Sequence, residues 1–87
     1  MLAVTAGRID AALRHFAQGL AFCDRAGYRT EYARTAADFA DALLAHAGTD
    51  GRAKAVALQD EALEVACELG MRPLEERVLA RRELLDA

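Results

Sequence analysis

Residues 51–72, GRAKAVALQDEALEVACELGMR, have the pattern of a single helix followed by its stop signal. Apolar residues cover roughly 200° of a helical wheel drawn over this stretch, which is typical of a helix with neighbours on two sides. Gly70 follows the last apolar residue, at the position where a left-handed glycine commonly ends a helix. We therefore expect a helix from about residue 52 to residue 69, at the centre of the packing.

An earlier stretch, residues 8–29, repeats this pattern when Gly27 is aligned with Gly70, an offset of 43 residues. The aligned pairs are Ala12 and Ala55, Phe16 and Gln59, Gly19 and Ala62, Leu20 and Leu63, and Arg29 and Arg72. A small residue lets a neighbouring backbone approach, and a large residue one turn away fills the space beside it. This spacing is the one that the second helix of a repeated helical hairpin requires.

The rest of the chain shows helical periodicity and no strand-like alternation, so we expect an all-α fold of antiparallel helical hairpins. The chain has 87 residues, which predicts one domain over residues 1–87. Four helices are expected, over residues 8–26, 31–47, 52–69 and 72–85. Thr30 is the expected N-cap of the second helix, residues 48–51 the expected turn, and Pro73 falls in the first turn of the fourth helix. The expected core residues are Phe16, Leu20, Phe39, Leu43, Leu58, Ala62 and Leu63.

Charge and composition narrow the class of partner. The net charge is −3 with one lysine, which argues against nucleic acid as the main ligand. No apolar run approaches the ~20 residues of a membrane span, and the first residues lack the pattern of a signal peptide. Two cysteines, Cys23 and Cys67, lie in helical patterns, which favours small buried residues in a reducing compartment. The expected location is the cytoplasm.

The reactive side chains do not form a recognisable catalytic or metal-binding pattern. His15 and His46 have no partner at the spacing of a metal site, and a packed or edge histidine is the simpler interpretation. Cys23 and Cys67 fall on faces that the wheel buries, where a nucleophile is unfavourable. We also interpret the acidic strip Asp60, Glu61, Glu64 and Glu68 mainly as a solvated face. The sequence thus predicts no catalytic residue, no cofactor and no metal.

Two sets of motifs carry a family resemblance. They are Gly7-Arg8, Ala12-x3-Phe16-x2-Gly19-Leu20 and Ala26-Gly27-Tyr28, and then Gly51-Arg52, Ala55-x3-Gln59-x2-Ala62-Leu63 and Leu69-Gly70-Met71. In motif and order the chain resembles tetratricopeptide-like repeats. It is more closely similar to the helical repeats in C-terminal regions of large bacterial signalling ATPases, transcriptional regulators and nucleotide-cyclase-related proteins. The resemblance implies a fragment of an α–α superhelix that acts as a protein-interaction scaffold and has no chemistry of its own.

Three features depart from that pattern. Gln59 stands where the repeat prefers an aromatic residue, and no proline follows the second helix of the hairpin. The first expected helix is also of the second-of-hairpin type and the last of the first-of-hairpin type. Since each hairpin of a repeat array buries its faces only against neighbours, these ends predict exposed apolar surface.

We therefore expect self-association, as a homodimer in which the fourth helix of one chain covers the first helix of another, or contact with a signalling protein. The candidate interface residues are Phe22, Leu74, Val78, Leu79, Leu84, Leu85, Glu61, Glu64, Glu68 and Arg81. In this arrangement the arginines of the fourth helix meet the acidic strip of the other chain. The alternative function is a small helical-bundle enzyme or ligand-binding protein that uses the histidines and cysteines.

Overall fold

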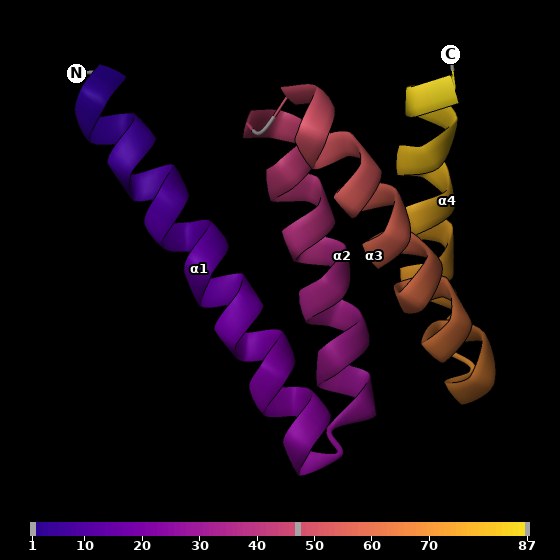
Figure 1. The fold of residues 1–87 in the computed structure, drawn as a ribbon. Coiled ribbons are helices and arrows are strands. Elements are labelled where there is room, and N and C mark those ends of the chain that lie inside the picture. Colours follow the sequence, from indigo (N-terminus) through magenta and orange to yellow (C-terminus); the bar gives the residue numbers. More distant parts are fainter. Residues whose placement is uncertain (1, 47, 87) are drawn as a thin grey trace.

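The computed structural model contains four helices: α1 (Leu2–Ala26), α2 (Arg29–His46), α3 (Gly48–Leu69) and α4 (Arg72–Asp86) (Figure 1). It describes the backbone of residues 2–46 and 48–86 and the side chains of residues 8–46 and 51–85. Within these ranges every residue is helical except for two short turns, and no strand occurs. The prediction of an all-α fold with four helices is confirmed.

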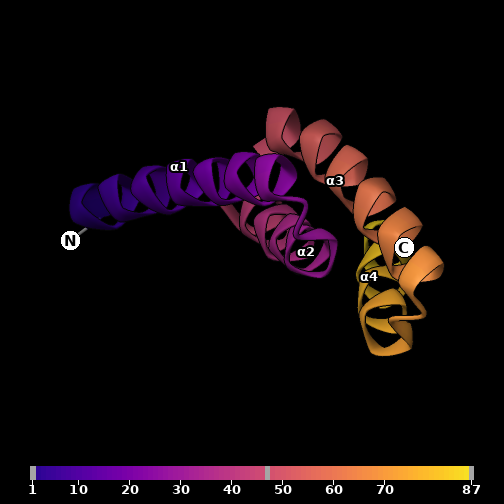
Figure 2. The same cartoon turned by 90° about the horizontal axis from the view of Figure 1, so that it is seen from below.

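Consecutive helices run antiparallel and pack side by side in chain order. Seen from below, α1 and α3 lie along one side of the array and α2 and α4 along the other (Figure 2). The result is a thin, zigzag array with extents of 41 × 35 × 19 Å. Both α2 and α3 have neighbours on two sides, which confirms the central position expected for residues 52–69.

Small residues dominate the core. Seven of its members are alanines that are at most 2% exposed, and a methyl side chain lets two helix backbones come near each other. The buried cluster consists of Ala33, Ala36, Ala37, Phe39, Ala40, Leu43, Ala55, Leu58, Ala62, Val65, Ala66, Leu74 and Val78. From α1, Leu13, Phe16 and Leu20 pack against it while partly buried, as does Leu63 of α3. The expected core residues thus lie in one cluster.

Two turns of the same construction connect α1 to α2 and α3 to α4. Gly27 and Gly70 have φ values of 75° and 70°, in the left-handed region that glycine adopts without steric cost. The Tyr28 N–H donates to the Cys23 carbonyl at 2.9 Å, and the Met71 N–H donates to the Ala66 carbonyl at 2.8 Å. These are the hydrogen bonds of a Schellman motif. The stops predicted at Gly27 and Gly70 are confirmed.

Replacing either turn glycine by alanine is expected to destabilise the fold by about 1–2 kcal/mol, the cost of a left-handed residue with a Cβ atom. No atom lies within 4 Å of a Cβ at Gly27 or Gly70, so backbone strain is the whole effect. Gly19→Ala is the control, because its Cβ would make an ordinary 3.6 Å contact with Thr35 Cγ2 inside a helix. It should stabilise by about 0.5–1 kcal/mol. Urea unfolding measures the change in the free energy of unfolding for each variant. A change of the same sign for Gly19→Ala and for the turn variants would contradict the prediction.

Three local predictions were wrong. Thr30 is not an N-cap, because α2 already begins at Arg29 and the Tyr32 N–H donates to the Tyr28 carbonyl at 2.9 Å. Residues 48–51 are not a turn, because α3 is helical from Gly48 onward. A glycine inside a helix costs only about 1 kcal/mol, which tertiary packing can outweigh. The first helix also begins at Leu2 rather than at residue 8, and the expected end of the second, residue 47, lies outside the described residues.

Candidate interaction surfaces

The contact of α1 with α2 is equivalent to the contact of α3 with α4. Phe16 of α1 stacks on Phe39 of α2 with ring centroids 5.7 Å apart. The residues 43 positions later are Gln59 and Arg82, and Arg82 Nε donates to Gln59 Oε1 at 3.3 Å. A hydrogen-bonded pair therefore occupies the place of an aromatic pair, which explains why Gln59 could stand where an aromatic residue was expected.

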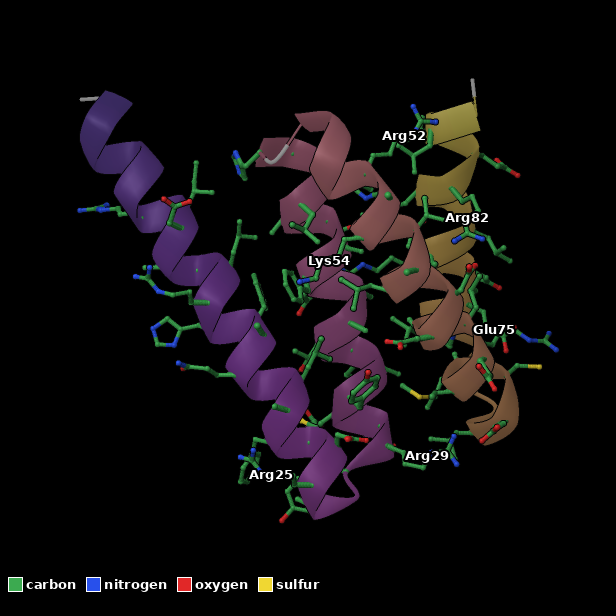
Figure 3. The ribbon with its side chains drawn as sticks, in the orientation of Figure 1. Arg25, Arg29, Arg52, Lys54, Glu75 and Arg82 are labelled. Carbon is green, nitrogen blue, oxygen red and sulfur yellow. The ribbon has the colours of Figure 1, made fainter. Side chains whose placement is uncertain are left out.

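Arg82 joins α4 to α3 through two further contacts (Figure 3). Its guanidinium donates to Asp60 Oδ1 at 2.7 Å and to the Val56 carbonyl at 3.0 Å. Gln59 is 1% exposed, and its Nε2 has no hydrogen-bond partner among the residues that the structure describes. A buried amide needs such partners to offset its lost hydration. Sequence reasoning missed this pair, although extending the 43-residue alignment to Phe39 would have pointed to Arg82.

Ion pairs connect α2 to α4. Arg77 donates to Asp38 and Asp41 at 2.7 Å each, and Arg81 lies 3.4 Å from Asp41. The hydrogen bonds to Asp41 and Asp38 raise the pKa of Arg77 above its usual value. We expected Arg81 to face the acidic strip of another chain. In the structure it instead pairs with Asp41 of its own chain, and Arg77 and Arg82 likewise have partners in the same chain.

The apolar interface candidates divide into two groups. Leu74 and Val78 are 8% and 2% exposed and belong to the chain's own core. They are therefore core residues and not the interface residues that we predicted. Leu85 is half-buried. Phe22, Leu79 and Leu84 are 54%, 49% and 70% exposed and remain available to a partner. A sparse apolar stripe therefore suffices for α4, since Arg82 supplies part of its attachment to α3.

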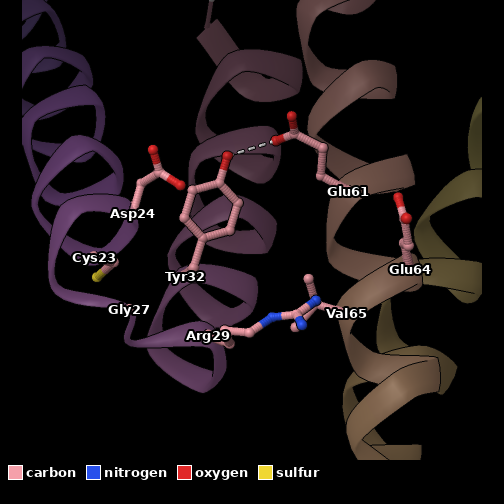
Figure 4. Close-up of a pocket in the computed structure, with 8 residues that line it drawn as sticks. All are labelled: Cys23, Asp24, Gly27, Arg29, Tyr32, Glu61, Glu64 and Val65. Carbon is pink, nitrogen blue, oxygen red and sulfur yellow. Dashed lines mark hydrogen bonds between the residues drawn. The ribbon is translucent and has the colours of Figure 1, made fainter.

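Two of the acidic candidates, Glu61 and Glu64, border a groove between the end of α1, the start of α2 and the middle of α3 (Figure 4). The groove encloses about 440 Å³ and is lined by Cys23, Asp24, Gly27, Arg29, Tyr32, Glu61, Glu64 and Val65. The Tyr32 hydroxyl donates to Glu61 Oε2 at 2.9 Å. Arg29 forms an ion pair with Glu68. The strip is thus exposed, as expected, but Asp60, Glu61 and Glu68 each have a partner on another helix or turn of the same chain.

Tyr32 has a pKa of about 12, raised first by burial, then by its hydrogen bond to Glu61 and by the charges of Glu61 and Asp24. A pKa above the unfolded value of about 10 means that this contribution to stability is complete below pH ~10 and is lost as pH rises towards 12. Absorbance titration of tyrosinate should show a step near pH 12. Tyr32→Phe should remove that step and Tyr28→Phe should retain it, and the reverse result would contradict the assignment.

The histidines and cysteines are dispersed. His15 and His46 are exposed, Cys67 is exposed, and Cys23 is buried, with both thiols free. Within residues 8–46 and 51–85 no group of three or more histidine, cysteine or acidic side chains has the arrangement of a metal site. Over the same part of the chain, no helix has the length and apolar character that crossing a bilayer requires.

Comparison of the chain with models of protein families, with curated proteins and with solved structures gave no match.

Proposed function

We propose that this chain is a non-catalytic scaffold for protein–protein contact, built from tetratricopeptide-like helical repeats. The observation that supports the proposal best is the pair of identical turns at Gly27 and Gly70, each followed by a helix that packs back at the same offset. Units that stack in this way contact only their neighbours and leave extended side surfaces for binding. The expected partner is a protein, either a second copy or a signalling protein.

The distribution of charged groups supports a binding role. Asp60 of the acidic strip pairs with Arg82 of α4, and Glu68 pairs with Arg29 of α2. Arg77 of α4 pairs with Asp38 and Asp41 of α2. Exposed pairs of this kind contribute little to stability, about 0–1 kcal/mol each. The resemblance to repeats of bacterial signalling proteins and the two free thiols support a cytoplasmic location.

The alternative, a small ligand-binding protein or enzyme, would use the groove beside Tyr32 and Glu61. It requires a bound species. Metal analysis of the purified chain and a small-molecule thermal-shift screen test it, and a saturable ligand that Tyr32→Phe abolishes would favour it over the scaffold.

Self-association is the part of the proposal that solution mass tests directly. Sedimentation equilibrium at tens of micromolar should give a dimer, because Leu79 and Leu84 expose large apolar side chains on one short helix. Leu79→Glu combined with Leu84→Glu should weaken the dimer at least tenfold by placing charges in the contact. Thr30→Glu, on the exposed surface of α2, is the control. A cooperatively folding monomer would refute self-association and restrict the scaffold to other partners.

A further inference from the structure

One face of α3 packs against α2, but no helix of the described chain packs against the equivalent face of α1. Gly19 lies beside Thr35 and Phe16 stacks on Phe39, so α1 uses towards α2 the face that α3 uses towards α4. The other face of α3 packs against α2. This is shown by Lys54, which lies 5.1 Å from the ring centroid of Phe39, and by the hydrogen bond from Tyr32 to Glu61. No helix of the described chain occupies the corresponding face of α1.

On α3, Leu58 and Val65 are buried, at 6% and 9% exposed. Their counterparts 43 residues earlier, His15 and Phe22, are both exposed. Phe22 stands on the surface at the position where Val65 is in the core, and its ring packs edge to face with that of Tyr28. We call the surface made of His15, Phe22 and Arg25 the outer face of α1.

We propose that the outer face of α1 binds an amphipathic α-helix of a partner protein in the way that α3 binds α2. This inference rests on the proposed scaffold function and names the surface and the chemistry of the partner. The outer face of α1 is distinct from the acidic groove and from the exposed leucines of α4.

The contact of α2 with α3 defines the apolar part of the partner helix. Besides Phe39 and Leu43, the buried residues of α2 are four alanines, Ala33, Ala36, Ala37 and Ala40, each at most 2% exposed. Their spacing places them on one side of a helix, and their size lets a neighbouring backbone approach. The partner helix should therefore carry small residues at the same spacing, against which Phe22 can pack.

The polar part of the partner helix follows from the charge at one position of α1, Arg25. Glu68 of α3 pairs with Arg29 at the start of α2. The counterpart of Glu68 on α1 is Arg25, which is exposed and projects on the side away from α2 (Figure 3). The sign of the charge is thus inverted, and the partner helix should carry a carboxylate where α2 has Arg29. A carboxylate in the first turn also suits the helix dipole.

A second copy of this chain does not meet these requirements through α4. At the positions of Ala33 and Ala40, α4 has Glu76 and Glu83, and at the position of Arg29 it has Arg72. Docked in the same way, α4 would bury two carboxylates without partners and place Arg72 beside Arg25. Burying unpaired charge is strongly unfavourable. Exchange of the fourth helix onto the first is therefore disfavoured at this face.

The test uses a labelled, N-acetylated peptide with the sequence of residues 29–46 and the substitution Arg29→Glu, titrated with the intact chain by fluorescence polarisation. We expect saturable binding, at least about fivefold tighter than for the unmodified peptide, since one repulsive charge pair becomes attractive. In the chain variant Arg25→Glu this preference should invert. A peptide bound elsewhere, for example in place of α2 on α3, would show no such inversion of the peptide preference.

Phe22→Gln should abolish binding of the peptide while leaving the thermal unfolding of the chain nearly unchanged, because Phe22 is 54% exposed. Leu69→Gln, at a position of α3 that is 46% exposed, is the matched control and should bind normally. Equal binding to Phe22→Gln, no dependence on Arg25, or no binding up to millimolar chain would overturn the inference. Each of these results leaves the sedimentation experiment intact, so failure of this site is distinguishable from failure of the scaffold function.

Discussion

Phe39→Ala is expected to lower the free energy of unfolding by about 3–5 kcal/mol, the typical cost of truncating a buried phenylalanine. Phe39 is 3% exposed and stacks on Phe16, with Lys54 above its ring. It therefore joins α1, α2 and α3, and its loss leaves a cavity where three helices meet. A domain of this size has a total stability of roughly 5–10 kcal/mol. Urea denaturation followed by circular dichroism should show a much lower midpoint.

Phe22→Ala is the matched control for this substitution. It removes the same side chain from a position that is 54% exposed, so the expected loss is below about 1 kcal/mol. Phe39→Leu should recover most of the stability, because it restores apolar volume without the ring. Similar losses for Phe39→Ala and Phe22→Ala would show that α1 does not pack on α2 as described.

Ala62→Leu is expected to destabilise the chain by about 1–3 kcal/mol, because three extra carbon atoms must enter a space that is already filled. Ala62 is 0% exposed and belongs to the core cluster shared by α2, α3 and α4. Its counterpart on α1 is Gly19, which lies close to Thr35, so the position is one of close helix approach in both contacts. Differential scanning calorimetry should show a lower melting temperature.

The control for Ala62→Leu is Ala80→Leu, at an exposed position of α4. Since leucine is nearly as good a helix former as alanine, the change there should stay within about 0.5 kcal/mol. An unchanged melting temperature for Ala62→Leu would mean that the helices are not closely packed at this point.

Local sequence alone determined the number of helices, the two glycine stops and most of the core. A left-handed stop depends on one residue without a Cβ atom and on the helix that precedes it, so Gly27 and Gly70 were identifiable without any long-range contact. Helical periodicity likewise placed Phe39, Leu43 and Leu58 on buried faces.

Tertiary structure decided what each of these helices packs against. Periodicity marks a face as apolar but does not name its neighbour, so Leu74 and Val78 were assigned to a second chain although they lie in the core of their own. The pairs of Arg77 with Asp38 and of Arg82 with Asp60 join residues 39 and 22 positions apart. Such pairs form only once the turns and helix offsets bring α4 beside α2 and α3.

The same distinction explains the helical start of α3 and the site on α1. Glycine and threonine at residues 48–51 favour a turn by local propensity, yet the preference amounts to only about 1 kcal/mol per glycine, and packing of Gly51, which is buried, can outweigh it. The sequence repeat likewise aligned two helices, but the outer face of α1 became recognisable only when the structure showed which side of α3 meets α2. Helix propensity is a property of neighbouring residues, whereas the partner of a face depends on residues that only the fold brings together.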